Sequence, residues 1–287
     1  MIYLLLSILA STAIFAVFKL FERHKINTFQ AIVVNYFTAC ICGALSYEET
    51  INTAEIINSK WFFGAISLGF LFIAVFNLMA FTAQRNGLSV ASVAGKMSVI
   101  IPVLFGIYAY NESLGFQKVF GIVLALIGVY LTSIKSKSSL KIGRSLWLPI
   151  LLFIGSGIID TTIKYIETTH VPKNGIPIFS ATIFGIAAII GTLILTYKVI
   201  TNTFQFRIKN VIGGVLLGVI NYYSIFFLLK ALQFEGLESS TVFTVNNVAI
   251  VMVSTLVGLF LFKEKISKKN WLGIFLAIIS ILLVTLA

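Results

Sequence analysis

Ten long apolar stretches, almost free of charged residues, dominate this 287-residue chain and limit what it can fold into. Hydrophobic residues make up 59% of the sequence and charged residues only 11%, against roughly 25% charged residues in soluble domains. Because one helical crossing of a bilayer takes ~20 apolar residues, ten crossings use about two thirds of the chain. A soluble enzyme, a secreted disulfide scaffold and a large extramembrane domain are therefore excluded.

The apolar stretches run without alternation, which favours helices over the strands of a membrane barrel. Their only internal charges are Lys96, Asp160 and Lys164, with Glu167 at the end of one stretch. The predicted spans are residues 1–18, 26–47, 61–84, 86–111, 119–134, 145–167, 174–197, 210–229, 239–262 and 270–287. We predict an all-α membrane protein with ten transmembrane helices in a lipid bilayer.

The basic residues, which give a net charge of +11, are unevenly divided among the loops between these spans. Fifteen Lys and Arg residues lie in the odd-numbered connections, whereas the even-numbered ones hold four, which are Lys60, Lys118, Lys173 and Lys230. Cytoplasmic loops of membrane proteins carry the excess of Lys and Arg. We therefore expect the odd connections in the cytoplasm and both termini outside it, and the charge does not indicate a nucleic-acid partner.

The two halves of the chain match each other in order, which indicates an internal duplication. We predict a first five-helix repeat over residues 1–140 and a second over residues 141–287. The matched residues are Lys19 and Glu22 with Lys164 and Glu167, Gly43 with Gly191, Gly64 and Gly69 with Gly213 and Gly218, Gly87-Leu88 with Gly236-Leu237, and Glu112 and Gly121 with Glu264 and Gly273. Since five is odd, the second repeat enters the membrane from the opposite side. Inverted repeats are typical of secondary transporters that work by alternating access around a site near the midplane.

The last helix of each half opens with the same short pattern. Glu112-x8-Gly121 and Glu264-x8-Gly273 resemble the pattern of EamA-type transporters of the drug/metabolite transporter superfamily. The resemblance extends through length, ten spans and duplication. It implies a bacterial inner-membrane carrier with external termini whose substrate is amino-acid-like, aromatic or drug-like. We expect both glutamates to lie at helix N-termini, where a carboxylate is stabilised, with transport chemistry as the alternative.

Two charged residues inside predicted spans are the first candidates for substrate binding. Lys96 lies ten residues after the start of the fourth span, about 15 Å deep at 1.5 Å per residue, where a lysine faces a wet cavity or a counter-charge. It either anchors a substrate carboxylate or phosphate, or snorkels to the cytoplasmic surface. Asp160 follows Ser156 and precedes Lys164 at helical spacing. It is a proton-coupling group, a binder of a substrate ammonium, or a partner of Lys164.

Polar side chains on several spans complete the predicted site. Amides in a bilayer need hydrogen-bond partners, so each either joins two helices or lines a cavity. The candidates are Asn35, Asn77, Asn221, Tyr222 and Asn247. We also expect Gly214-x3-Gly218 to let two helices approach closely, and Pro102 to disturb the fourth span.

The chain lacks the sequence patterns of ATP-driven pumps and of enzymes. No phosphate-binding loop, metal-binding pattern or nucleophile arrangement occurs, so we expect no catalytic residue, no metal and no cofactor. The hypothesis is a secondary carrier for a small metabolite, with export favoured and protons as a candidate coupling ion. A membrane-embedded scaffold or enzyme is the alternative, a passive channel is a weaker one, and the sequence does not decide between monomer and homodimer.

Overall fold

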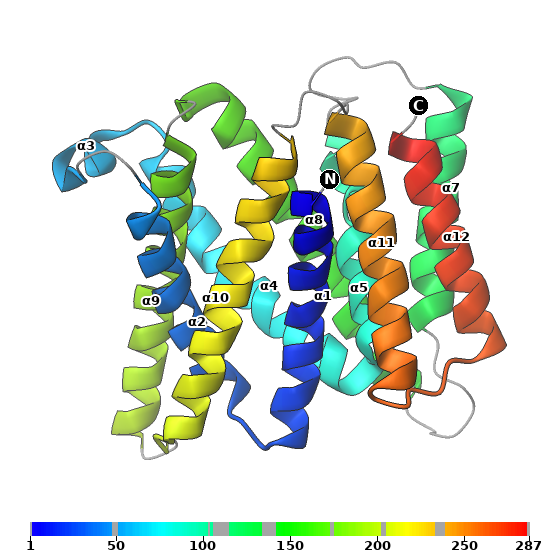
Figure 1. Ribbon diagram of the computed structural model, residues 1–287, viewed down its shortest axis with the longest axis horizontal. Coiled ribbons are helices and arrows are strands. Elements are labelled where there is room, and N and C mark those ends of the chain that lie inside the picture. Colours follow the sequence, from blue (N-terminus) through cyan, green and yellow to red (C-terminus); the bar gives the residue numbers. More distant parts are fainter. Residues whose placement is uncertain are drawn as a thin grey trace. The chain divides into compact units, whose positions relative to one another are not determined.

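The fold is helical throughout the part of the chain that the computed structural model describes, which is residues 2–47, 51–102, 104–105, 115–133, 142–172, 175–201, 205–232 and 239–285. These residues contain eleven helices and no strand (Figure 1). The helices are α1 (Ile2–Arg23), α2 (Thr28–Leu45), α3 (Thr53–Asn58), α4 (Phe62–Asn86), α5 (Leu88–Met97), α7 (Phe116–Ser133), α8 (Ile142–His170), α9 (Ile176–Ile200), α10 (Ile208–Leu232), α11 (Ser239–Phe260) and α12 (Lys268–Thr285).

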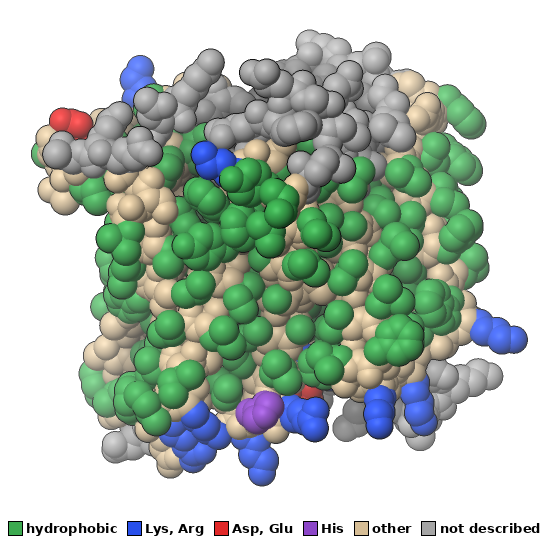
Figure 2. Space-filling model, viewed as in Figure 1, with side chains coloured by type: hydrophobic (Ala, Val, Ile, Leu, Met, Phe, Trp, Pro, Cys, Tyr) green, Lys and Arg blue, Asp and Glu red, His purple; other side chains and the backbone are tan. Residues whose placement is uncertain are grey.

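Each predicted span corresponds mainly to one helix, although the fourth begins with the last residue of α4, and the short helix α3 is additional. Among the described residues, six helices are long and apolar enough to cross a membrane, and three shorter apolar helical segments lie at Leu88–Pro102, Val119–Thr132 and Val245–Phe260. On the face seen in Figure 2, hydrophobic side chains cover the flanks of the helices in each unit, while Lys and Arg gather near helix ends. The all-helical prediction is confirmed for the described residues.

The fourth predicted span differs from the structure at its start and is interrupted inside, while residues 106–111 lie outside the described residues. Asn86 is the last residue of α4, and Gly87 separates it from α5, which ends at Met97. The chain turns at residues 98–99 and is helical again at 100–102. Pro102 has no N–H to reach the Ser98 carbonyl, which accepts from Ile101 N–H at 2.9 Å instead. The expected disturbance by Pro102 therefore falls one turn before the proline, as a break in the helix.

The helices divide into two compact units that are not consecutive halves of the chain. Unit 1 comprises Met1–Leu20, Leu78–Ile158 and Tyr223–Ala287, and unit 2 comprises Phe21–Asn77 and Ile159–Tyr222. Each unit contains segments from both sides of residue 140, so each takes helices from both predicted repeats. The repeat boundary at residues 140–141 lies outside the described residues. The matched residues Glu112, Gly236 and Leu237 also lie outside them.

Unit 1 is built around α5, α7, α11 and α12, which pack on one another (Figure 1). Its apolar core joins α5 residues such as Val93 and Met97 to Val251 of α11 and to Ala277 and Ile281 of α12, all almost completely buried. Burial of each large apolar side chain stabilises a folded state by roughly 1.5–3 kcal/mol relative to water. This core fixes the position of α5.

Two glycines bring the backbones of α7 and α12 together in unit 1. A Cβ on Gly128 would lie 3.1 Å from the Gly273 carbonyl oxygen, and Ser280 Oγ donates to the Gly121 carbonyl at 2.7 Å. Gly121 and Gly273 are 152 residues apart, and so are Gly128 and Ser280. Gly128 contacts Gly273, and their matched positions, Ser280 and Gly121, contact each other as well. The contacts therefore run in opposite directions along the two helices, which are antiparallel.

Unit 2 has α2 packed on α9, with glycines at both ends of the contact. A Cβ on Gly43 would lie 3.1 Å from Ala181 Cβ, and one on Gly191 would lie 2.5 Å from Val33. Gly43 and Gly191 are 148 residues apart, as are Val33 and Ala181. The partners are again exchanged between matched positions, and α2 and α9 are also antiparallel.

Other matched glycines of unit 2 also contact residues that occupy matched positions in the two halves of the sequence. Gly64 of α4 faces Ile166 of α8, and Gly213 of α10 faces Phe21, which stands 145 residues before Ile166. A third set pairs Gly69 with Ile186 and Gly218 with Thr38, and a Cβ on either glycine would lie 2.6 Å from the side chain opposite. The Gly214-x3-Gly218 prediction is confirmed, since a Cβ on either of these two glycines would lie 2.6 Å from a carbonyl oxygen of α2.

Candidate functional site

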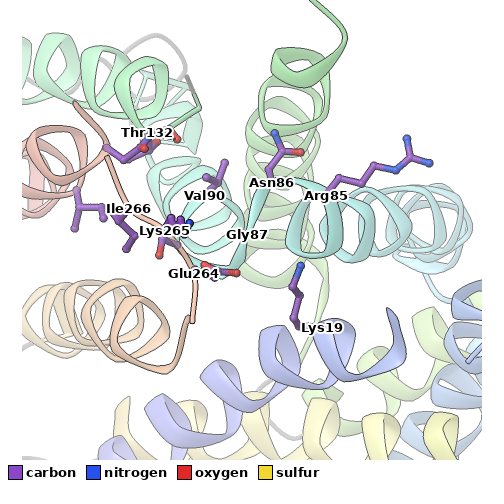
Figure 3. Close-up of a pocket in the computed structure, with 12 residues that line it drawn as sticks. Lys19, Arg85, Asn86, Gly87, Val90, Thr132, Glu264, Lys265 and Ile266 are labelled. Carbon is purple, nitrogen blue, oxygen red and sulfur yellow. Dashed lines mark hydrogen bonds between the residues drawn. The ribbon is translucent and has the colours of Figure 1, made fainter. Parts of the chain in front are cut away.

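A polar pocket of about 200 Å³ opens at one end of α5 in unit 1 (Figure 3). It is smaller than the roughly 300–1,000 Å³ of sites for drug-sized ligands. We call it the α5 pocket, and its lining residues are Lys19, Arg85, Asn86, Gly87, Ser89, Val90, Thr132, Glu264, Lys265, Ile266, Asn270 and Ile274. These come from α1, the α4–α5 junction, the first turn of α5, α7, the α11–α12 connection and α12.

Glu264, in the α11–α12 connection, is the acidic residue of this pocket, and it caps the N-terminus of α5. Leu88 N–H donates to both carboxylate oxygens, at 2.9 Å to Oε1 and 3.1 Å to Oε2. Glu264 therefore lies at a helix N-terminus, as expected, but the helix is α5 and not the last helix of the chain. The last helix, α12, starts at Lys268 and is capped by Ser267, whose Oγ accepts from Asn270 N–H at 3.2 Å.

Two glycines make room for the Glu264 carboxylate. Gly87 has a φ of +108°, a backbone conformation that other residues rarely adopt, and a Cβ there would lie 2.9 Å from Oε2. A Cβ on Gly258 of α11 would lie 2.7 Å from the same oxygen. Any side chain at either position would displace the carboxylate.

Basic side chains surround the pocket. Lys19 Nζ donates to the Gln84 carbonyl at 2.7 Å, and Gln84 Nε2 donates to the Phe18 carbonyl at 3.0 Å, so the end of α1 is tied to the end of α4. Figure 3 shows Lys19 pointing from α1 toward the start of α5, whereas Arg85 points away from it. The Arg85 guanidinium lies 5.5 Å from the centre of the Phe81 ring.

Lys96, the first predicted site residue, lies two turns further along α5 and is half-buried. Between it and the pocket, Ser254 Oγ of α11 donates to Ser92 Oγ at 2.6 Å. Ser92 was not predicted, because a single serine in an apolar stretch carries no distinctive signal. The α5 helix that bears Lys96 is thus joined to the second half of the sequence by a cap, a hydrogen bond and an apolar core.

Two predicted residues meet in unit 2. Asn221 Nδ2 of α10 donates to Asn35 Oδ1 of α2 at 3.3 Å, and Asn35 Nδ2 donates to the Ile32 carbonyl at 3.4 Å. Asn35 is completely buried and Asn221 is 5% exposed. Tyr222, beside Asn221, is also buried. The contact joins helices of opposite sequence halves, and this amide pair remains a candidate for substrate binding.

The remaining predicted residues are more scattered. Asn77 is half-buried on α4, and its Nδ2 donates to the Ile73 carbonyl of the same helix at 2.7 Å. Asn247 is buried on α11 in unit 1. Asp160 is exposed on α8, although Ser156 one turn earlier is buried, and the side chain of Lys164 lies outside the described residues.

Sequence reasoning missed two buried polar contacts. Asn210 Nδ2 donates to Gln30 Oε1 at 2.6 Å in unit 2, and Asn210 Oδ1 accepts from Asn27 N–H at 3.0 Å. In unit 1, Ser7 Oγ lies 3.2 Å from Asn246 Oδ1, to which it donates. Asn210 and Gln30 stand near the ends of predicted spans, where polar residues are ordinary, so their pairing depends on tertiary contact.

Comparisons with known proteins agree with a polytopic carrier. The EamA-like transporter family matches residues 1–134, and the Sugar transport protein family matches residues 114–287. An uncharacterized protein of Haemophilus influenzae is 32% identical over 97% of this chain and 95% of its own length. The glucose uptake protein GlcU of Staphylococcus xylosus is 32% identical over 63% of this chain and 60% of its own length.

A protein of known crystal structure shares the fold along almost the whole chain. It is 14% identical, with a TM-score of 0.58, and the match covers 99% of this chain and 96% of that one. Together with the apolar helices, these findings define a multi-pass membrane transporter that resides in a lipid bilayer and moves a small molecule. The chain belongs to the Sugar transport protein family, whose model covers residues 114–287, and its residues 1–134 match the EamA-like transporter family of the drug/metabolite transporter superfamily.

Proposed function

We propose that the protein is a secondary-active transporter that takes up a sugar or a similarly small polar metabolite across the bacterial inner membrane. It works by alternating access between two inverted five-helix repeats, residues 1–140 and 141–287, that give ten crossings and place both termini outside the cytoplasm. The observation that carries this proposal is the match to two transporter families, one of them a sugar transport family.

The exchanged contacts of matched residues support the inverted duplication. When a two-fold axis relates two elements, residue i of one contacts residue j of the other and the reverse also holds. The Gly43–Ala181 and Val33–Gly191 contacts have this form. Because α2 and α9 are antiparallel, the axis that relates them is perpendicular to the helices. For helices that cross a bilayer, such an axis lies in the membrane plane, as in inverted repeats.

The substrate class and direction rest on the relative GlcU, whose name describes glucose uptake. Uptake therefore replaces export, which the sequence favoured, as the proposed direction. Sugar hydroxyls both donate and accept hydrogen bonds, and a side-chain amide offers two donors and an acceptor with two lone pairs. Asn35, Asn221 and Tyr222 are the residues that suit such a substrate, and Asn77 and Asn247 offer the same chemistry.

Substitution of a charged candidate can distinguish a neutral sugar substrate from an anionic one. Lys96 suits a carboxylate or phosphate, and Asp160 suits a proton or an ammonium group. If the substrate is a neutral sugar, replacing Lys96 by Ala should change its transport only modestly. If the substrate is an anion, the same replacement should abolish transport while the protein still folds.

Transport by the purified protein in proteoliposomes tests the proposal. Labelled D-glucose should enter with saturable kinetics, and unlabelled glucose trapped inside should accelerate its entry by exchange. Two external pH values at fixed internal pH then test protons as the coupling ion. Flux that does not saturate would indicate a channel. No flux of glucose, amino acids or sugar acids would favour a scaffold or an enzyme.

A further inference from the structure

The α5 helix starts without a side chain of its own to cap it. Gly87 stands at the N-cap position and makes no side-chain hydrogen bond, although the first N–H groups of any helix need a partner from outside the helix. The carboxylate of Glu264, 176 residues later, takes the Leu88 N–H instead. The start of α5 thus depends on a residue in the α11–α12 connection.

The space beside Gly258 is filled by the side chain of Glu264. The three atoms nearest to a Cβ on Gly258 are Oε2, Cδ and Cγ of Glu264, at 2.7, 3.2 and 3.7 Å. The Glu264 N–H also donates to the Gly258 carbonyl at 2.9 Å, which fixes the backbone of the connection. A side chain at position 258 would therefore collide with the side chain of Glu264.

Charge also favours the ionised carboxylate at this point. Lys19 and Lys265 line the same pocket from α1 and the α11–α12 connection, and Lys19 points toward the start of α5 (Figure 3). A negative charge at a helix N-terminus is stabilised by the helix dipole, and the effect is confined to the first turn. A glutamine in the place of Glu264 could still accept the Leu88 N–H but would carry no negative charge.

We propose that Glu264 is a positioning residue for transport: it latches the first turn of α5, and thereby the helix that carries Lys96, to the α11–α12 connection. The proposal rests on the transporter function proposed above. Eight residues of helix, about 12 Å, separate Leu88 from Lys96. Release of the latch alters the placement of α5 without removing any residue of the predicted substrate site.

Hydrogen exchange of the full-length protein in nanodiscs tests the latch without any substrate. The amides at the start of α5 should exchange roughly five- to tenfold faster in Glu264→Ala, since a helix cap contributes ~1 kcal/mol. Gly258→Ala should have the same effect, because its Cβ displaces the carboxylate. The double variant should exchange no faster than Glu264→Ala alone. Gly95→Ala, on the same helix with no atom within 4 Å of its Cβ, is the control.

Glucose exchange in proteoliposomes tests the role in transport. Per folded molecule, Glu264→Ala and Gly258→Ala should change KM or the exchange rate at least threefold and in the same direction, whereas Gly95→Ala should not. A merely structural role would lower the folded fraction and leave KM unchanged, which would overturn the positioning role.

The outcomes separate the two proposals. Unchanged exchange of the α5 amides in both variants, or additive effects in the double variant, would overturn the latch. If the wild-type protein moves no glucose, the sugar proposal fails. The latch is then judged on hydrogen exchange alone, where faster exchange of the α5 amides supports it.

Discussion

The glycine contacts of unit 2 and the carboxylate cap of unit 1 hold helices together by different means. In unit 2, α2 meets α9 and α10 at glycines, and the places of closest approach are matched between the halves of the sequence. In unit 1, α5 is fixed by the Glu264 carboxylate and by an apolar core. Contacts of the first kind depend on shape, and the cap depends on charge. Salt and small changes of volume should therefore affect the two regions differently.

The largest effect is expected where a glycine faces backbone. Gly218→Ala would place a Cβ 2.6 Å from the Asn35 carbonyl oxygen, which cannot rotate away. We expect the free energy of unfolding to fall by about 3 kcal/mol, whereas Gly95→Ala should raise it by roughly 0.5–1 kcal/mol. Denaturation of the two variants in detergent measures the difference. Equal stabilities would contradict close approach in unit 2.

Gly64→Ala should be less damaging and should be rescued. Its Cβ would collide with the end of the Ile166 side chain, and the nearest atom there, Cδ1, is absent from valine. We expect a loss of about 2 kcal/mol for Gly64→Ala. Adding Ile166→Val should recover most of it, although Ile→Val alone costs about 1 kcal/mol. Thermal unfolding of the single and double variants checks this, and additive losses would mean that the conflict lies elsewhere.

The cap in unit 1 should respond to salt. Glu264→Gln keeps the length of the side chain and removes its charge, so we expect a loss of about 1 kcal/mol at low ionic strength. The difference from wild type should shrink in about 1 M salt, where the Debye length is ~3 Å. The effect of Gly218→Ala should not change with salt. A salt-independent Glu264→Gln would remove the contrast between the two regions.

The smallest effect on stability is expected at the amide pair. Hydrogen bonds between membrane helices contribute ~0.6 kcal/mol each, so a double-mutant cycle of Asn35→Ala and Asn221→Ala should give a coupling of about that size. If the pair binds substrate, each variant should also raise KM for glucose more than its loss of stability explains. A coupling without any change of KM would assign the pair to packing alone.

Spacing in the sequence was enough for some of these features and not for others. Pro102 predicted a disturbance of the fourth span because its missing N–H is a local property, and the structure has a break at residues 98–99. Glu264 was expected at a helix N-terminus, but its partner, Leu88, is 176 residues away. The polar residue Asn35 was predicted as a candidate from its type, and its contact with Asn221 required the packing of α2 against α10.

The sequence by itself determined the membrane environment, the positions of the helices and the matched pattern of glycines, because these follow from apolar length and from residues that act locally. Tertiary structure decided which matched residues touch, which helix Glu264 caps, and that Asp160 is exposed while Asn35 is buried. Those outcomes depend on atoms far apart in the chain being brought within a few ångströms. Hydropathy and spacing do not encode such a distance.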